Sequence, residues 1–469
     1  MTAPGGRPAS LALPPPPAAV HFIGIGGIGM SGLARILRAW DYRVTGSDAA
    51  ESPQTAALSR EGIPVVIGHG ATAAANADLL VISAAIHEDD PELLAARAAG
   101  VRVIKRAELL GMLANARRSV AVAGSHGKST TSGMLTSALL ALDAAPSYAV
   151  GAVIGTTGTN AAPGDGDIMV VEADEYDYSF LWLHPDVAIV TNVDYDHPDI
   201  FPDQTAYDEA FSRFISGIKP DGVLIIATDD PGCQRVLQLR RDDLSRPARV
   251  VTFGESHDAD WQLTGDGTGW TVNTPDGGRL PLRLTVPGRH NARNAVAAAA
   301  AMAALGWSTD AAIESLASYR GVGRRFDFKG CAGDVIVIDD YAHHPTEIRA
   351  TIAAAREQYP DRRLWAVFQP HTYSRTKALM TEFAMALAAA DDVIVLDIYP
   401  SRETDSLGIS SADLVNRLPK PGHAGGQPAE VADYLTNHVQ AGDVVLTIGA
   451  GDVTQIGPQL LAALSRRDL

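Results

Sequence analysis

Residues 120–135, VAVAGSHGKSTTSGML, have the pattern of a buried strand, a short glycine turn and the start of a helix. Backbone N–H groups at a helix N-terminus attract phosphate oxygens, so this arrangement predicts a phosphate-binding loop. A Walker A loop places four residues between its first glycine and its Gly-Lys pair. Here only Ser125 and His126 separate Gly124 from Gly127. A glycine turn without a ligand is the alternative interpretation.

The loop offers the groups that a magnesium nucleotide requires. Lys128 would neutralise the β- and γ-phosphates, and the Ser129 hydroxyl is a suitable oxygen ligand for Mg²⁺. The loop residues predicted to bind the nucleotide are Gly124, Ser125, His126, Gly127, Lys128, Ser129 and Thr130.

A second glycine pattern lies near the start of the chain. Gly24, Gly26 and Gly29 follow a predicted strand and open a predicted helix, and Asp48 ends the next strand. This is the context of the dinucleotide-binding fingerprint. The turn itself requires only a diphosphate, so a UDP-sugar fits it as well as NAD, and a ligand-free turn stays an alternative.

Acidic residues follow two predicted parallel strands of the same domain as the short loop. They are Glu172, Asp174, Glu175 and Asp177 in VVEADEYD, and Asp194 and Asp196, with His197, in TNVDYDHPD. Carboxylate oxygens suit Mg²⁺, which predicts a metal site beside the nucleotide. Helix caps or solvated loop charges are the alternative for any one of them.

Amide and basic side chains then indicate the far side of the nucleotide site. His290, Asn291 and Asn294 start a helix in GRHNARNA, where amides can contact a purine edge or simply cap the helix. Arg324 and Arg325 lie in the glycine-rich hinge YRGVGRRF, where a guanidinium can clamp a phosphate or face solvent.

Two further polar segments end predicted strands in the last third of the chain. DDYAHHPTE contains Asp339, Asp340, His343, His344 and Glu347, and FQPHTYSRTK contains His371, Arg375 and Lys377. The paired histidines lack the helical spacing of H-E-x-x-H, so the pattern favours a polar pocket for a carboxylate or amine over a zinc site.

The order of strands and helices predicts the organisation of the chain. A length of 469 residues is too great for one core, and three α/β series with parallel strands are expected. Residues 250–254 (VVTFG) and 258–284 are expected to be antiparallel. The predicted divisions are a flexible Pro-rich tail at 1–18 and domains at 19–117, 118–322 and 323–469.

Composition limits the classes of function. A net charge of −17 argues against broad contact with nucleic acid or an anionic membrane. The two cysteines match no metal spacing, and no apolar run is long enough to cross a bilayer. We expect a cytoplasmic protein with small-molecule ligands.

Nine ordered segments together resemble the Mur ligase family of peptidoglycan synthesis, from about Val20 to Asp452. They are HFIGIGGIGMSG, GSHGKSTT, EADEYD, NVDYDH, GRHNARNA, RRFDFKG, DDYAHHPTE, FQPHTYSRT and GAGD. The resemblance implies a Rossmann-like UDP-binding domain, a central P-loop ATPase α/β domain and a Rossmann-like C-terminal domain that receives the amino acid.

The resemblance also implies an activity. ATP would phosphorylate the lactyl carboxylate of UDP-N-acetylmuramate, and the amine of L-alanine would displace phosphate from the acyl phosphate. The implied cofactors are ATP and Mg²⁺, the implied partners are the two small-molecule substrates, and the implied state is a monomer or weak homodimer.

The resemblance assigns roles to individual residues. Those implied in catalysis are Lys128, Glu172 and His197, and those implied in metal binding are Ser129, Glu172 and His197. Beyond the loop, ATP would contact His290, Asn291, Asn294, Arg324 and Asp340. Substrates would contact Gly24, Gly26, Gly27, Gly29, Met30, Ser31, Asp48, Ser83, Arg325, Tyr341, His343, His371 and Arg375.

Three features depart from the family pattern, without removing a core catalytic group. The loop has Ser125 and Ser129 where the family usually has threonine at both hydroxyl positions, a change that preserves the oxygen ligand. Thr372 stands where some members carry an arginine, which places more of the substrate anchoring on Arg375. Ser83 is followed by alanine where many members have a second serine.

Three rival functions account for these residues less well. A recycling ligase that adds a preformed tripeptide to the same sugar nucleotide lacks the His-Thr-Tyr pattern of FQPHTYSR. An NAD-dependent oxidoreductase would leave Lys128 and Ser129 without a role. A non-catalytic nucleotide-binding regulator does not account for Lys128, Glu172 and His197 together.

Overall fold

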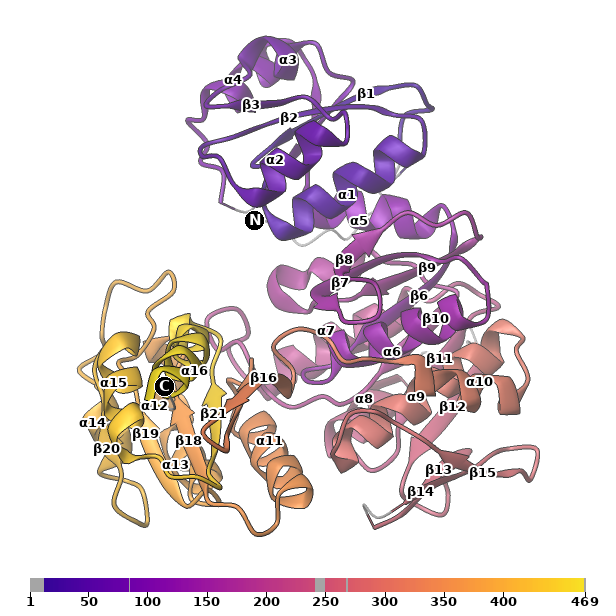
Figure 1. The fold of residues 1–469 in the computed structure, drawn as a ribbon. Coiled ribbons are helices and arrows are strands. Elements are labelled where there is room, and N and C mark those ends of the chain that lie inside the picture. Colours follow the sequence, from indigo (N-terminus) through magenta and orange to yellow (C-terminus); the bar gives the residue numbers. More distant parts are fainter. Residues whose placement is uncertain (1–11, 84, 241–248, 267–268, 468–469) are drawn as a thin grey trace.

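The computed structural model describes residues 12–83, 85–240, 249–266 and 269–467. These residues form three sheets of five, ten and six strands, each flanked by helices. In Figure 1 the five-stranded part lies above the ten-stranded part, and the six-stranded part lies at the side of the latter. The predicted three-part α/β architecture is confirmed.

The first sheet is entirely parallel, and its order β3-β2-β1-β4-β5 matches the first five strands of the Rossmann order 3-2-1-4-5-6. Its elements are β1 (Ala19–Ile23), α1 (Ile28–Ala39), β2 (Arg43–Asp48), α2 (Pro53–Arg60), β3 (Val65–Ile67), α3 (Ala71–Ala75), β4 (Leu79–Ile82), α4 (Pro91–Ala98), β5 (Arg102–Lys105) and α5 (Arg106–Asn115). Caps fix the helix starts, as where Asp90 accepts hydrogen bonds from the first turn of α4.

The segment before β1 contacts this domain. Tyr42 Oη donates to the carbonyl of Pro14 over 2.8 Å, and Ala18 is buried. Residues 12–18 of the predicted flexible tail therefore lie against the protein, and residues 1–11 lie outside the described residues.

The central sheet has the order β15-β14-β13-β12-β11-β10-β6-β9-β7-β8. Its first half contains β6 (Arg118–Ala123), α6 (Lys128–Ala141), β7 (Ser147–Ile154), β8 (Thr159–Ala162), β9 (Ile168–Glu172), the 3₁₀ helix η1 (Tyr176–Trp182), β10 (Val187–Val190) and α7 (Gln204–Ser216). Its second half contains β11 (Val223–Ala227), α8 (Pro231–Arg240), β12 (Arg249–Gly254), β13 (Trp261–Gly265), β14 (Trp270–Asn273), β15 (Arg279–Leu282), α9 (Arg289–Leu305), α10 (Thr309–Ser315) and η2 (Leu316–Ser318).

The prediction that VVTFG is antiparallel is wrong. These residues lie in β12, which pairs parallel with both β11 and β13. Helix α8 returns the chain to the edge of the sheet at which β11 began. Strand β12 therefore starts at that edge and runs parallel to β11. The expected antiparallel pairing holds further on, between β13 and β14 and between β14 and β15.

The third sheet has the order β16-β17-β21-β18-β19-β20, with an antiparallel β16–β17 hairpin at one edge. Its strands are β16 (Asp327–Ala332), β17 (Val335–Asp340), β18 (Leu364–Phe368), β19 (Asp392–Val395), β20 (His423–Ala424) and β21 (Val444–Ile448). Its helices are α11 (Pro345–Gln358), α12 (Tyr373–Ala378), α13 (Met380–Leu387), α14 (Ser411–Val415), α15 (Pro428–His438), η3 (Asp452–Gln455) and α16 (Ile456–Arg467).

The central strands of each sheet are buried on both faces, which explains their unbroken apolar runs. Every residue of β10, β18 and β21 is buried. Since parallel strands end at a common edge, the polar segments that follow them gather there. Among the described residues, no helix has both the length and the hydropathy needed to cross a bilayer.

Candidate nucleotide and substrate sites

The short loop joins β6 to α6 and is held by the end of β10. Gly124 has φ +134° and Gly127 has φ +83°, and a side-chain carbon at Gly124 would collide with the Thr191 hydroxyl. Asn192 Oδ1 accepts from the His126 N–H over 2.8 Å, and Thr191 Oγ1 donates to the His126 carbonyl over 2.6 Å. The neighbouring strand end thus fixes the shortened loop.

Lys128 starts α6 and folds back over the loop. Its Nζ donates to Glu175 Oε2 over 2.7 Å and to the Gly124 carbonyl over 2.6 Å. Burial opposes the charge, but the carboxylates of Glu175 and Asp174 outweigh it and raise the pKa of Lys128. The ammonium is therefore fully charged at neutral pH.

Acidic side chains surround this ammonium. Glu175 is buried, and it also lies 3.5 Å from His197 Nε2. Burial and the charge of Glu175 raise the pKa of Asp174, whereas Glu172 accepts the Gly151 N–H over 2.7 Å. These carboxylates place several oxygen atoms beside the loop that could serve as metal ligands.

Two other acidic residues lie outside this set. Asp177 is more than half exposed and pairs with Lys105 of the first domain over 3.2 Å. Asp194 Oδ2 instead accepts from Thr346 Oγ1 of the third domain over 2.7 Å.

A cavity of about 230 Å³ lies between the central and third domains. Its lining brings together residues predicted to bind the nucleotide, namely His126, Gly127, Thr130, His290, Asn291, Asn294 and Asp340. It also includes Asn192, Asp230, Tyr319 and Thr346, which were not among the predicted site residues, and Glu347, which was predicted for a polar pocket of the third domain. We call it the nucleotide cavity.

The α9 residues lie in different local environments within this cavity. Asn291 Nδ2 donates to the Pro287 carbonyl over 2.6 Å, so its amide is engaged within the turn. Burial and the nearby Arg325 guanidinium lower the pKa of His290 to about 4, which keeps that imidazole neutral. The contact of these side chains with a purine stays a prediction.

The two hinge arginines point in different directions. Arg325 lines the nucleotide cavity and pairs with Glu347 over 2.9 Å. Arg324, whose φ of +59° turns the backbone, pairs with Asp339 and donates to the Gly449 carbonyl over 2.6 Å. The sequence assigned Arg324 to ATP and Arg325 to substrate; the structure places only Arg325 on the cavity lining.

Asp340 also lines the cavity, but both of its oxygens already have partners. They accept the N–H groups of Phe326 and Ala342 over 2.9 and 2.8 Å. Burial raises the pKa of Asp340 to about 6, despite the opposing charge of Arg325.

The predicted amino-acid pocket gathers around Arg375. Its guanidinium donates to Asp196 Oδ1 over 2.8–2.9 Å and lies 3.3 Å from His371 Nδ1. Burial lowers the pKa of His343 to about 3 and that of His371 to about 4, so both imidazoles are neutral. Tyr341 packs against His343, with ring centroids 5.3 Å apart.

A second cavity, of about 370 Å³, lies between the first and central domains. Gly27, Gly29, Met30 and Ser83 line it from the first domain, and Glu172 and Asp174 line it from the central domain. We call it the sugar-nucleotide cavity.

The remaining predicted residues of the first domain form the turn behind this cavity. Asp48 Oδ2 accepts the Gly26 N–H over 2.8 Å, and Ser31 Oγ donates to the Ile28 carbonyl over 3.3 Å. Gly24 begins the same turn with φ +77°. These residues shape the loop without lining the cavity.

Two residues that sequence reasoning did not select complete the sites. Arg106, at the start of α5, lines the sugar-nucleotide cavity beside Gly29. Its position in the first turn of a helix, where a cation is unfavourable, is a signal that could have identified it. Tyr207 lies within α7, and its Oη bonds Ser125 Oγ over 2.8 Å; nothing in the sequence marked it.

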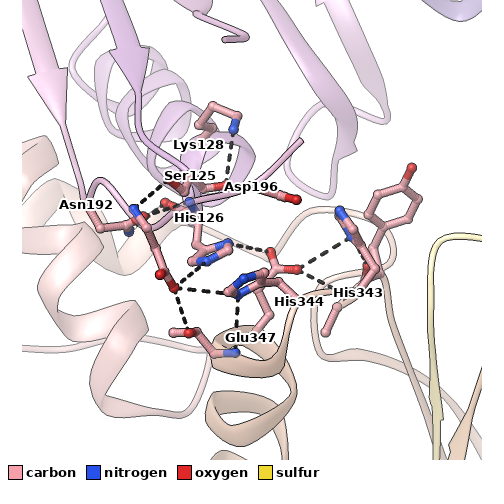
Figure 2. A network of polar contacts seen from close by, with 12 residues as sticks. Ser125, His126, Lys128, Asn192, Asp196, His343, His344 and Glu347 are labelled. Carbon is pink, nitrogen blue, oxygen red and sulfur yellow. Dashed lines mark hydrogen bonds and ion pairs between the residues drawn. The ribbon is translucent and has the colours of Figure 1, made fainter. Parts of the chain in front are cut away.

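Polar contacts connect the central and third domains across the nucleotide cavity. Figure 2 shows His126 between the loop residues on one side and His344 and Glu347 on the other. His126 Nε2 lies 3.3 Å from Asp194 Oδ2, and its Nδ1 lies 3.5 Å from Glu347 Oε1. The site is therefore completed only when the third domain packs against the central domain.

A short phosphate loop, acidic residues beside its lysine and cavities on both sides define a nucleotide-dependent α/β enzyme. Three family descriptions match successive parts of the chain: the Mur ligase family catalytic domain at residues 19–118, the Mur ligase middle domain at 122–302, and the Mur ligase glutamate ligase domain at 324–451. The chain belongs to the Mur ligase family, whose members are ATP-dependent ligases.

Two curated relatives that align with nearly the whole chain carry the same name. The UDP-N-acetylmuramate–L-alanine ligase of Streptomyces coelicolor is 45% identical and the ligase of the same name from Thermobifida fusca is 43% identical. Each alignment covers 95% of this chain, and 97% and 96% of the respective relatives.

Solved structures agree with the fold. The UDP-N-acetylmuramate-alanine ligase of Thermotoga maritima aligns with a TM-score of 0.77 at 28% identity, covering 96% of this chain and all of that one. A murein peptide ligase from Psychrobacter arcticus aligns with a TM-score of 0.71 at 25% identity, covering 96% and 99%.

Proposed function

We propose that this protein joins L-alanine to the lactyl carboxylate of UDP-N-acetylmuramate, with ATP converted to ADP and phosphate. The observation that carries the proposal is that one acidic cluster lies beside both the sugar-nucleotide cavity and the phosphate loop. Glu172 and Asp174 line the sugar-nucleotide cavity, and the same two carboxylates act on the charge of Lys128 in the phosphate loop. A carboxylate substrate in one cavity would therefore lie near the terminal phosphate of ATP in the other.

The donor set beside the loop fits Mg²⁺. Ser129 is buried at the start of α6, and Glu172 and His197 flank the acidic cluster. In this proposal the three residues hold the cation, which supplies positive charge against the phosphates and the substrate carboxylate. The carboxylates Asp174 and Glu175 favour a cation there because they are buried close together.

Phosphoryl transfer needs positioning and charge neutralisation more than a protein nucleophile. Lys128 would move from Glu175 to the γ-phosphate, whose charge its ammonium balances during transfer. The bond from phosphorus to the β-phosphate oxygen breaks as the bond to the lactyl carboxylate oxygen forms. The product of this step is an acyl phosphate.

The third domain would present the amino acid to that acyl phosphate. Arg375 is the cation for the alanine carboxylate, and the neutral imidazoles of His343 and His371 leave room for an amine without like-charge repulsion. The neutral amine forms the new C–N bond at the acyl carbon, the C–O bond to phosphate breaks with its electron pair on the phosphate, and the proton lost by nitrogen passes to that phosphate.

The cytoplasm, where both small-molecule substrates would be available, is the proposed location, and a monomer or weak homodimer is the proposed state. Neither nucleic acid nor membrane is a partner in this proposal. The net charge of −17 supports the exclusion of polyanionic partners.

The deciding assay follows phosphate release with ATP, Mg²⁺ and UDP-N-acetylmuramate while the amino acid is varied. Release that requires the sugar nucleotide and is greatest with L-alanine is expected, with much weaker release with glycine or L-serine. Release without the sugar nucleotide, or a preference for a preformed tripeptide over L-alanine, would contradict the proposal.

Isotope transfer tests the intermediate separately. When the lactyl carboxylate carries ¹⁸O, one labelled oxygen is expected in the released phosphate, because the acyl phosphate breaks at its C–O bond. Unlabelled phosphate would rule out the acyl phosphate even if the ligation itself occurred.

A further inference from the structure

A group of His and Asp side chains at the domain contact has the composition of a metal site. His126, Asp194 and His344 each offer a ligand atom, and these atoms lie within 4.8 Å of one another in the described part of the chain. Two of the three donors are imidazole nitrogens, which suit Zn²⁺ and neighbouring transition metals rather than Mg²⁺. The group differs from Ser129, Glu172 and His197, the residues proposed for Mg²⁺.

The spacing of the ligand atoms agrees with a tetrahedral ion. His126 Nε2 lies 3.3 Å and His344 Nδ1 lies 3.5 Å from the same oxygen, Asp194 Oδ2. Ligand atoms about 2.0–2.1 Å from zinc in tetrahedral geometry are about 3.3 Å apart. An ion bound there would replace these two contacts and also the 3.4 Å contact that His344 Nδ1 makes with the Thr346 N–H.

The surroundings also resemble those of a metal-binding histidine. His126 directs its second nitrogen, Nδ1, to Glu347 Oε1 at 3.5 Å, and such a carboxylate orients a ligand imidazole. Glu347 is itself held by Arg325 over 2.9 Å. The side chains of His126 and His344 are 11% and 6% exposed, whereas Asp194 is 40% exposed, which leaves a path for an ion.

Two domains supply the ligands. His126 lies in the phosphate loop and Asp194 follows β10, both in the central domain, whereas His344 caps α11 of the third domain. His126 and Asp194 also line the nucleotide cavity. An ion here would hold the third domain against the central domain and would occupy space beside the nucleotide.

We propose that His126, Asp194 and His344 bind one Zn²⁺ ion, which locks the central and third domains together beside the nucleotide cavity. The three protein ligands leave a fourth position for water or a phosphate oxygen. The site is additional to the magnesium nucleotide and does not depend on the identity of the substrates proposed above.

The variant His344→Asn separates metal binding from helix capping. Without the ion, His344 Nδ1 accepts the Thr346 N–H over 3.4 Å as the cap of α11, and an asparagine oxygen can cap the helix in the variant while the imidazole ligand is lost. Asp194→Asn is a second variant, which keeps an oxygen acceptor for the Thr346 hydroxyl but removes the carboxylate charge. His69→Asn is the matched control, because His69 also lies near two carboxylates, those of Asp90 and Glu92, but in the first domain.

The experiment titrates the full-length, metal-free protein with Zn²⁺ against a chromophoric chelator. One equivalent is expected to bind to the wild type and to His69→Asn alike, with affinity reduced at least about tenfold in His344→Asn and in Asp194→Asn. Co²⁺ is expected to give the strong visible absorption of a tetrahedral site, and Zn²⁺ is expected to reduce the radius of gyration of the wild type. Equal Zn²⁺ affinity in wild type and both cluster variants, or a loss of binding in His69→Asn alone, would overturn the proposal.

Discussion

Lys128 is the residue whose charge connects the loop, the acidic cluster and the proposed phosphoryl transfer. Its ammonium is almost completely enclosed by protein and rests on Glu175. A buried ammonium costs stability when it is unpaired, so the ion pair with Glu175 stabilises the charge at the loop.

Replacing this lysine should therefore abolish turnover while the fold survives. We expect Lys128→Ala to lower kcat by at least about 10²–10³-fold, because the lost interaction strengthens as phosphate charge moves. Steady-state phosphate release measures the effect, and circular dichroism checks the fold. Lys219→Ala, which removes a lysine paired with Asp186, is the control and should keep wild-type turnover; unchanged turnover in Lys128→Ala would exclude the assigned role.

The imidazoles of His126 and His290 should have widely separated pKa values. Burial opposes protonation of His126, but hydrogen bonds from its ring to Asp194 and Glu347 outweigh burial and raise the pKa of His126 to about 9. Burial together with the charge of Arg325 instead lowers the pKa of His290 to about 4.

The sign of the linkage follows from these two values. The His126 contact stabilises the folded protein fully below the unfolded pKa of about 6.5, and this contribution is lost as pH rises through about 9. His290 has the opposite effect. The unfolded chain protonates this histidine below about pH 6.5, whereas the folded protein does so only below about pH 4. Lowering the pH from about 6.5 to about 4 therefore destabilises the folded protein. NMR of histidine-labelled, metal-free protein, assigned with His126→Gln and His290→Gln, measures both; a His126 titration near 6.5 would refute the ion-pair description.

At the scale of elements, close packing of α1 against β8 sets the position of the first domain. A side-chain carbon at Gly32 of α1 would lie 2.5 Å from the Ala161 Cβ of β8. Glycine at this position allows the helix to approach the strand, and the sugar-nucleotide cavity lies beside the same contact.

Adding one methyl group there should disturb both stability and substrate affinity. We expect Gly32→Ala to destabilise the contact by about 1–3 kcal/mol and to raise KM for the sugar nucleotide more than KM for ATP. Thermal unfolding and initial rates give the two readouts. Gly269→Ala, where a new carbon meets nothing within 4 Å, is the comparison and should behave as wild type; equal behaviour of both variants would contradict the packing argument.

Strands and the glycine turns that follow them were predictable because their signals are local. The buried run of β6 and the glycines that follow it fix a strand, a turn and a helix without reference to the rest of the chain. The direction of β12 was not predictable in this way, because it depends on the crossover through α8. The opposite orientations of Arg324 and Arg325 also depend on a local backbone turn, which the sequence RRF does not reveal.

At the scale of the whole molecule, a buried ion pair joins the third domain to the central one. Arg375 and Asp196 are 5% and 4% exposed, and their contact spans 179 positions in the sequence. Burial would raise the pKa of Asp196, but Arg375 holds this pKa far below its ordinary value. No sequence pattern pairs two such residues, so this part of the site could not be predicted.

Breaking the ion pair between Arg375 and Asp196 should allow the third domain to move away from the central domain. Removing one partner of a buried pair costs about 3–5 kcal/mol, so Asp196→Asn should favour separation of the third domain. Small-angle scattering should report a larger radius of gyration, and KM for the amino acid should rise. Asp391→Asn disrupts an exposed pair with Arg356 within the third domain and should leave the dimensions unchanged; an unchanged radius in Asp196→Asn would show that other contacts hold the domains together.

The pairing of Lys128 with Glu175 has a consequence for the end of the catalytic cycle. A buried cation with no other partner would hold spent phosphate tightly and slow its departure. If Lys128 binds the γ-phosphate as proposed, Glu175 would lie within reach to pair with the ammonium again as the phosphate leaves, and no uncompensated charge would be exposed. The Glu175 carboxylate would thus compete with the phosphate product for the Lys128 ammonium. Release of phosphate would then leave Lys128 paired with Glu175 before the next ATP binds.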